Sequence, residues 1–395
     1  MYLDRTYRPR RRRQGAGRFW PVYLLIALGI ILYKQQPAWL SSRQLQPTPT
    51  PTRSAIAYLS DAESALKAGK YDEAQVAYAE ANRLEPNNAD GWAAQSEIQM
   101  IFRDATKAYE FSQRAVNAGP KNPRALTAQA RALNWLGKNE QALDAALNAL
   151  DADPQYATAL AVLGEIYTDE GNVAKAEDYL KQAQALEPNN VTMLRNWAYL
   201  YQRRQQYPEA ISAYDAALAV APVRFDLFLE KGLLYRVSLA DYKNANAAYD
   251  RAVRLYKSPV TLDYYGEGLY NSDDPLQAVR VLREAVEIDP TYGPAQAHLG
   301  MALFIRHNYE DAVAPLEKGI QLLGDKARTE QFYTLGLAYI YKEPSDCDKA
   351  AFWLNKALTM DPGNSIALSG MNNLKSCETS TDTLTSTLTS TPTSP

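Results

Sequence analysis

Apolar and polar positions along most of the chain follow a helical rhythm that repeats about every 34 residues. Alanines mark it in two series that stand seven residues apart within each period, as in Ala74 with Ala81 and Ala278 with Ala285. Alanines seven apart lie on one face of a helix, and their small side chains let a neighbouring helix approach closely. A proline then follows at a fixed place in six periods, at Pro86, Pro120, Pro154, Pro188, Pro222 and Pro290. Because proline lacks an amide hydrogen and helps to stop a helix, the period predicts a solenoid of stacked helix pairs.

The helix that precedes each alanine helix has a pattern of its own. Leucine, glycine and tyrosine occur at a fixed spacing in two repeats, as Leu163, Gly164 and Tyr167 and again as Leu335, Gly336 and Tyr339. With Trp92, the alanines and the prolines, this pattern resembles the tetratricopeptide repeat family. The resemblance implies an all-α, right-handed superhelix whose first helices line a concave groove for protein partners.

Nine repeats account for residues 55–364 as one solenoid. They are expected to start near Ala55, Ala89, Pro123, Ala157, Val191, Phe225, Pro259, Gly293 and Thr329. The sixth repeat has a one-residue shift between its helices, and the ninth carries an insertion around Lys342 to Asp346. Residues 365–377 are predicted to form a capping helix, because a terminal repeat needs its apolar face covered.

The first 54 residues differ in composition from the repeats. Residues 1–18 are rich in arginine, and an apolar run from Phe19 to Tyr33 follows. Such a run is short for a bilayer, but flanking aromatic and basic side chains extend its reach. We therefore expect a transmembrane signal-anchor helix over residues 19–40, with a cytoplasmic N-terminus and an extracytoplasmic solenoid. A cleaved secretory signal and a tail that never meets a membrane are the alternatives.

Charge separates the two parts of the chain. Residues 1–54 hold ten of the 42 basic residues and one of the 45 acidic residues, so the remainder has a formal net charge of −12. An acidic solenoid does not suit nucleic acid, which selects basic surfaces. Residues 41–54 are rich in proline and threonine and suggest an extended linker, whereas residues 378–395 have the composition of a disordered tail.

Few residues are candidates for a disulfide, a metal site or catalysis. The two cysteines, Cys347 and Cys377, are predicted to form a disulfide between the last repeat and the end of the capping helix; two free thiols are the alternative. His298 and His307 lie in one repeat without an acidic or cysteine partner at ligand spacing. No phosphate loop, dinucleotide turn or nucleophilic serine motif occurs, so we expect no enzyme activity, no metal and no cofactor.

The resemblance places a partner in the groove formed by the first helices. The residues expected to line it are Arg131, Trp135, Arg195, Tyr199, Arg203, Leu233, Tyr270, Met301, Phe304, Leu337 and Tyr341. Arginine, tryptophan and tyrosine are enriched at interface hot spots. We therefore expect a membrane-anchored scaffold or adaptor that binds peptide or protein partners. The alternative is a structural envelope protein that assembles with copies of itself.

Overall fold

The computed structural model describes residues 19–35 and 53–374, and every regular element in these two ranges is helical. The chain separates into two units, residues 1–53 and 54–395. In the first unit, α1 (Trp20–Gln35) is apolar around its whole circumference. Within the described ranges, no helix is both long enough and apolar enough to span a membrane. The predicted 19–40 helix is thus described only as far as Gln35, and residues 36–40 lie outside the described residues.

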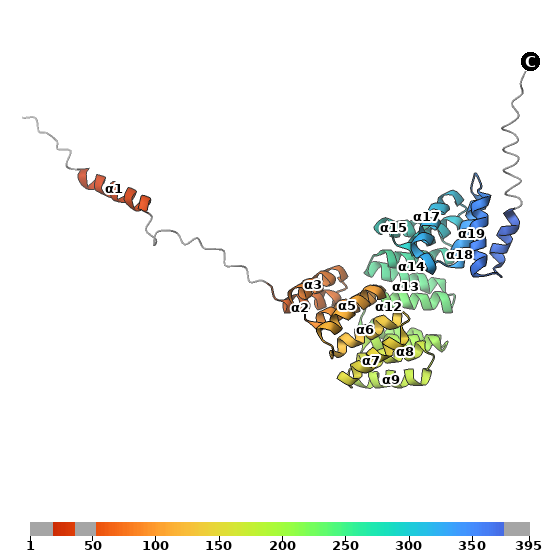
Figure 1. Cartoon of the computed structure of the whole chain (residues 1–395), viewed down its shortest axis with the longest axis horizontal. Helices are drawn as coiled ribbons and strands as arrows, with labels where there is room; N and C mark the ends of the chain where they lie inside the picture. The colour runs from red at the N-terminus through yellow and green to blue at the C-terminus, as the bar shows by residue number, and fades with distance from the viewer. Residues whose placement is uncertain (1–18, 36–52, 375–395) are drawn as a thin grey trace, which may run out of the picture. The chain divides into compact units, whose positions relative to one another are not determined.

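The second unit is a solenoid of helix pairs (Figure 1). Its nine first helices begin at the nine residues from which the repeats were expected to start. The first helices are α2 (Ala55–Lys67), α4 (Ala89–Ile101), α6 (Pro123–Trp135), α8 (Ala157–Asp169), α10 (Val191–Arg203), α12 (Phe225–Leu233), α14 (Pro259–Asn271), α16 (Gly293–Ile305) and α18 (Thr329–Tyr341). The second helices are α3 (Tyr71–Leu84), α5 (Ala105–Ala118), α7 (Asn139–Ala152), α9 (Val173–Leu186), α11 (Tyr207–Val220), α13 (Tyr242–Leu255), α15 (Pro275–Ile288), α17 (Tyr309–Leu323) and α19 (Cys347–Met360).

Small residues allow the two helices of a repeat to pack closely. Ala142 and Ala176, from the periodic alanine series, are fully buried. Gly164 of α8 faces Leu180 of α9 so closely that a Cβ on the glycine would lie 2.6 Å from the leucine Cγ. That distance leaves no room for a methyl group. The glycine of the sequence pattern is therefore a packing requirement of the helix pair.

The one-residue shift in the sixth repeat has a structural cause. Immediately after α12, the chain makes a π-helical turn at η2 (Leu234–Ser238) before α13 begins. A π-turn accommodates one extra residue within a helix. The turn absorbs the shift, and Ala245 of α13 is still fully buried.

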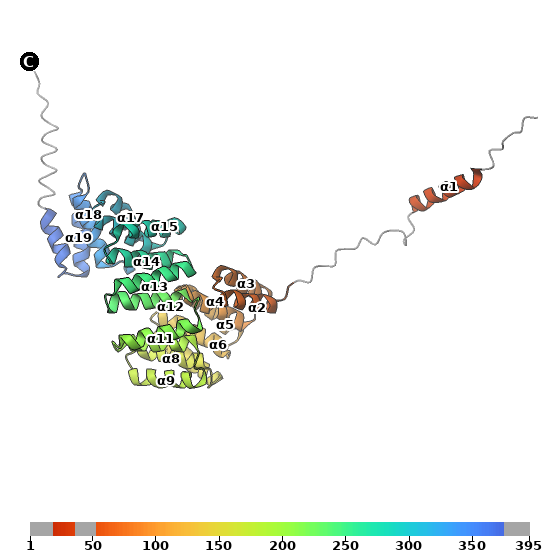
Figure 2. The same ribbon diagram turned by 180° about the vertical axis from the view of Figure 1, so that it is seen from behind.

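The solenoid closes on itself after its first five repeats. The hydroxyl of Tyr71 at the start of α3 donates a hydrogen bond to the carbonyl oxygen of Val223, 152 residues later, at 2.7 Å. The rings of Tyr71, Phe102, Phe225 and Tyr256 pack against one another with centroids 5.0–6.0 Å apart. The two views show α12 and α13 beside the first two helix pairs (Figures 1 and 2). The first five repeats thus form a closed turn, and α13 to α19 continue beyond it.

A terminal helix covers the C-terminal end of the solenoid over the residues that the structure describes, as expected. Residues 365–374 are helical, and Ala367 and Leu374 are buried in the same apolar cluster as Leu354 of α19. Gly370 lies against the Leu354 side chain. The remaining residues of the predicted capping helix, 375–377, and the predicted disordered tail lie outside the described residues, as do the N-terminal basic segment and most of the linker.

Candidate functional site

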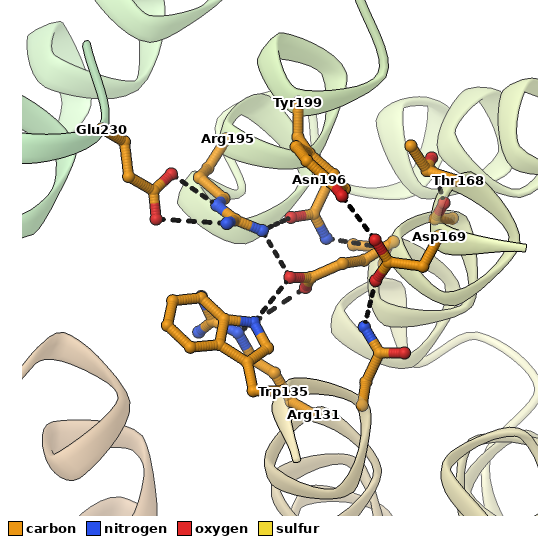
Figure 3. Close-up of polar contacts among 12 residues, drawn as sticks. Arg131, Trp135, Thr168, Asp169, Arg195, Asn196, Tyr199 and Glu230 are labelled. Carbon is orange, nitrogen blue, oxygen red and sulfur yellow. Dashed lines mark hydrogen bonds and ion pairs between the residues drawn. The ribbon is translucent and has the colours of Figure 1, made fainter. Parts of the chain in front are cut away.

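Charged side chains from four successive first helices meet on the inner side of the closed turn (Figure 3). Arg131, Glu165 and Tyr199 stand 34 residues apart, so they occupy the same position in α6, α8 and α10. The asparagine caps of α6 and α10 fix where these helices begin, since Asn122 accepts from the Ala125 amide and Asn190 from the Met193 amide. Equivalent positions in stacked repeats face the same side, which brings these groups together.

Arg195 is the centre of the cluster. Its guanidinium donates to both oxygens of Glu230, from Nε at 2.7 Å and from Nη2 at 3.1 Å. Its Nη1 donates to Glu165 Oε1 at 2.5 Å and to Asn196 Oδ1 at 2.9 Å. Arg195, Glu165 and Glu230 are all buried, so the prediction that Arg195 lines an open groove was wrong. Arg195 therefore ties α8, α10 and α12 together through charge-assisted hydrogen bonds.

The two buried carboxylates have further donors. The indole nitrogen of Trp135 donates to Glu165 at 2.8 Å, and the Tyr214 hydroxyl donates to Glu230 at 3.3 Å. Burial by itself would raise the pKa of Glu230, but Arg195, with help from Arg103 and Arg131, lowers it to about 2. Glu230 is thus ionised at neutral pH although it lies in the interior.

Asp169 at the end of α8 extends the cluster toward the surface. It accepts hydrogen bonds from the Tyr199 hydroxyl and, at 2.6 Å, from Asn134 Nδ2. The Tyr199 side chain is half-buried, and the adjacent Arg203 is exposed. Among the described residues, Arg203 makes no hydrogen bond or ion pair with this network, whereas the other predicted groove residues of this half contact it.

Arg131 differs from the other arginines of the cluster. Its Nε is buried without a hydrogen-bond partner among the described residues, and Glu165 Oε2 lies 3.7 Å away. Its guanidinium carbon lies 5.9 Å from the Trp135 ring centroid. Burial lowers the pKa of Arg131, and the positive charges of Arg195 and Arg224 lower it further. The attraction of Glu165 raises the pKa but does not offset these effects. Arg131 is therefore a desolvated cation with incomplete compensation.

Two cavities flank this cluster. The first, which we call the arginine cavity, has a volume of about 420 Å³ and is lined by Leu66, Glu97, Ile101, Arg124, Thr127, Ala128, Arg131, Tyr156, Thr158, Val162, Thr192 and Arg224. The second, the aromatic cavity, has a volume of about 740 Å³. Its walls include Phe102, Arg103, Trp135, Tyr264 and Tyr292. Trp135 and Arg131, one helical turn apart on α6, thus border different cavities.

Of the residues that line the aromatic cavity, the sequence patterns found only Trp135, and they missed Arg103, Tyr264 and Tyr292 among others. The Arg103 guanidinium carbon lies 5.2 Å from the ring centroid of Trp135 and 5.5 Å from that of Tyr264. Its Nη1 also contacts Glu230 Oε1 at 3.5 Å. Repeats two, three and seven meet here only because the first turn closes, and the repeat period carries no signal of that closure.

The predicted groove residues of the C-terminal half do not form one exposed apolar surface. Met301 and Leu337 are buried, so their assignment to an open groove was wrong. Met301 belongs to the apolar cluster of the C-terminal repeats, and Leu337 lies against Gly370 of the terminal helix, where apolar burial is favourable. Leu233, Tyr270 and Phe304 are half-buried, and Tyr341 is 42% exposed. Phe304 and Tyr341 pack with Tyr309 at the edge of the solenoid.

His298 lies in a second buried polar cluster. Its Nδ1 is 2.7 Å from Asp263 Oδ1, and its Nε2 is 3.1 Å from Arg328 Nη2. Burial alone would lower the pKa of His298, but the charge and hydrogen bond of Asp263 raise it. His307 is exposed and its Nδ1 contacts the Tyr309 hydroxyl at 2.6 Å. In residues 19–35 and 53–374, no group of His, Cys, Asp or Glu has the arrangement to hold a metal ion.

The predicted disulfide joins one described residue to one that is not described. Cys347, the one cysteine among the described residues, is the first residue of α19 and is not a free thiol. Cys377 lies outside the described residues. The pairing of Cys347 with Cys377 therefore stays a prediction.

The network predicts that replacing either of two arginines on the same inner face changes the free energy of unfolding by very different amounts. Arg195→Met leaves Glu165 and Glu230 buried without their main cation, so the free energy of unfolding should fall by about 3 kcal/mol or more. Arg131→Met removes no hydrogen bond and should change it by less than about 1 kcal/mol. Urea unfolding followed by circular dichroism measures both. Equal losses for the two variants would contradict this account of the network.

Comparison with known proteins agrees with this architecture. Residues 59–123, 127–191 and 195–260 match the family model described as tetratricopeptide repeat. The chain is 32% identical over 157 residues to the photosystem I assembly protein Ycf3 of Cyanophora paradoxa, covering 39% of this chain and 79% of Ycf3. It is 25% identical over 281 residues to the human protein O-mannosyl-transferase TMTC3, covering 69% of this chain and 31% of TMTC3. The chain thus spans about a third of the length of TMTC3.

A solved structure shows the same fold. The crystal structure of the APC/C hetero-tetramer Cut9-Hcn1 aligns with a TM-score of 0.60 at 17% identity, covering 77% of this chain and 59% of the matched chain. At this identity the likeness concerns the fold alone. The repeat period, the helix pairs, the family model and the similarity to Ycf3 agree, and the chain belongs to the tetratricopeptide repeat family.

Proposed function

We propose that this protein is a non-enzymatic scaffold that docks a protein or peptide partner at the aromatic cavity of its closed turn. Proteins built from tetratricopeptide repeats generally mediate protein–protein interaction and assembly. The observation that carries the proposal is the meeting of Arg103, Trp135, Tyr264 and Tyr292 around one cavity of about 740 Å³. Arginine, tryptophan and tyrosine are the side chains that most often dominate binding energy.

The cavity walls suit a partner with both apolar and polar groups. Trp135 and Tyr264 are half-buried, so their ring faces are held in place while part of each stays accessible. Arg103 lies between them, and its stacking limits the conformational freedom lost on binding. Gln75, Lys107 and Lys326 also line the cavity and offer hydrogen-bond donors to a peptide backbone or carboxylate. A few preorganised anchors, rather than buried area alone, would set the affinity.

We further propose that the scaffold is anchored to the cell membrane by the N-terminal segment. The support is the character of α1, in which Leu25, Ile26 and Ile30 are each at least half exposed and no polar face exists. An exposed apolar surface of this kind suits lipid. Basic residues precede the helix, and such residues favour the cytoplasmic side. The proposed topology therefore has a cytoplasmic N-terminus and an extracytoplasmic solenoid.

The docking proposal predicts that partners are lost when the aromatic cavity loses its anchors. A Trp135→Ala/Tyr264→Ala double variant should reduce partner crosslinks at least tenfold in intact cells, because hot-spot truncations cost over about 1.4 kcal/mol. Crosslinking with quantitative mass spectrometry on the full chain measures this. Phe352→Ala is the matched control, since Phe352 is a 61% exposed aromatic side chain on α19.

Two results would contradict docking at this cavity. One is an unchanged partner set in a double variant that keeps its helical circular dichroism. The other is a set that contains only copies of this chain, equally crosslinked in all variants, which would instead support the self-assembling structural role.

Membrane anchoring predicts how the protein behaves on fractionation. The full chain should stay in the membrane pellet after an alkaline carbonate wash, and Leu25→Arg should release it, because a charge in an apolar segment costs several kcal/mol in lipid. Leu25→Ile should be retained and serves as the control. A wild-type chain that is released by carbonate, or a Leu25→Arg variant that is retained as fully as wild type, would refute the anchor.

A further inference from the structure

The arginine cavity is built only when the first turn closes. Its lining comes from both ends of that turn, since Leu66 belongs to the first repeat and Arg224 precedes the sixth. Between them, Arg124, Thr158 and Thr192 occupy the same position in three successive first helices. A volume of about 420 Å³ falls within the range of pockets that hold small molecules. The cavity is therefore a concave site of defined lining that is partly open to solvent.

Arg131 presents unused hydrogen-bond donors at this cavity. No hydrogen bond joins its guanidinium to any other described residue, and 13% of its side chain is exposed. A guanidinium carries five N–H donors, and buried donors without a partner are costly. Glu165 Oε1 accepts the bonds from Arg195 and Trp135, whereas Oε2 lies 3.7 Å from Arg131 Nε, where the two form an ion pair but no hydrogen bond. Glu165 thus balances the charge of Arg131 in part, while Nη1 and Nη2 of Arg131 have no hydrogen-bond acceptor among the described residues.

The other two arginines of the cavity are paired with carboxylates, but one terminal nitrogen of each guanidinium makes no hydrogen bond to a described residue. Arg124 donates to Glu97 from Nε at 2.8 Å and from Nη2 at 2.7 Å. Arg224 binds Asp226 through the same two atoms, at 2.7 and 2.6 Å. In both, Nη1 makes no hydrogen bond to another described residue. These forks fix the two guanidinium planes, so they are preorganised to add a donor to a ligand that Arg131 holds.

We propose that the arginine cavity binds a small molecule that carries an oxyanion, either a carboxylate or a phosphate, with Arg131 as its anchor. Both groups place two oxygens in one plane and match the fork of a guanidinium. The hydroxyls of Thr158 and Thr192 also line the cavity and are neutral donors for the rest of such a ligand. Because the Arg131 side chain is mostly buried, an anion gains more from it than from an arginine at an exposed surface. This site is separate from the aromatic cavity and does not depend on protein docking there.

The experiment titrates purified full-length protein with a fixed panel of probes by isothermal titration calorimetry at constant ionic strength. The carboxylate probes are succinate, citrate and glutamate, and the phosphate probes are inorganic phosphate, pyrophosphate and glycerol 3-phosphate. Succinamide and glycerol are the neutral counterparts of succinate and glycerol 3-phosphate. A blocked Gly-Glu-Glu-Gly peptide distinguishes a free small anion from an acidic protein segment. The variants are Arg131→Met, which keeps the apolar stem, and Arg251→Gln, which removes an exposed arginine of α13 as the matched control.

The proposal expects saturable binding of at least one small anion, no binding of its neutral counterpart, and at least tenfold weaker binding to Arg131→Met. Arg251→Gln should bind like wild type, and the better probe class identifies the oxyanion. No saturable binding of any small anion overturns the proposal, as does equal binding by Arg131→Met. Binding of the acidic peptide alone also overturns it and assigns the cavity to protein recognition.

Discussion

The contact between the first two repeats and the segment around Val223 determines the inner surface of this solenoid. Tyr71 donates to the Val223 carbonyl, and four aromatic rings from repeats one, two and six fill the space between the two ends of the turn. Burying aromatic rings of this size is strongly favourable. Without this contact, Leu66 and Arg224 would not line one cavity and Arg103 would not lie between Trp135 and Tyr264.

Closure also explains why so many charges lie inside the protein. Facing first helices bring arginines and carboxylates close to one another, where an unpaired charge is costly and a paired one holds helices in register. Arg195 satisfies two carboxylates at once, whereas Arg131 is left with donors that no described residue uses. The same geometry thus produces a rigid network and, beside it, an unsatisfied cation. The first ties the helices together, and the second is the basis of the proposed ligand site.

The repeat architecture was predictable to the residue because it is local. Alanine spacing, the Gly164 to Leu180 contact and the prolines act within one helix pair, so they are present in the sequence pattern. Even the irregular sixth repeat was visible as a one-residue shift, although its π-helical form was not. The site was predictable only in part. Trp135, Arg131 and Arg195 were found from their positions in the first helices, whereas Tyr264 and Tyr292 join them only through closure between distant repeats. Met301 and Leu337 were misplaced because helical spacing alone does not distinguish a groove position from one that packs against the next repeat.

Closure of the first turn is most directly tested by an engineered disulfide between residues 69 and 223. A Cβ added at Gly69 would lie 3.1 Å from the Val223 Cβ, close enough to be joined by a disulfide after a small adjustment. Gly69 has a positive φ, but Arg103 and Gln205 show that side chains are accommodated at the equivalent turn position. A Gly69→Cys/Val223→Cys chain should form this bond in high yield under mild oxidation in the folded state, and peptide mapping identifies it. Failure of the two cysteines to pair in the folded protein would contradict a closed turn.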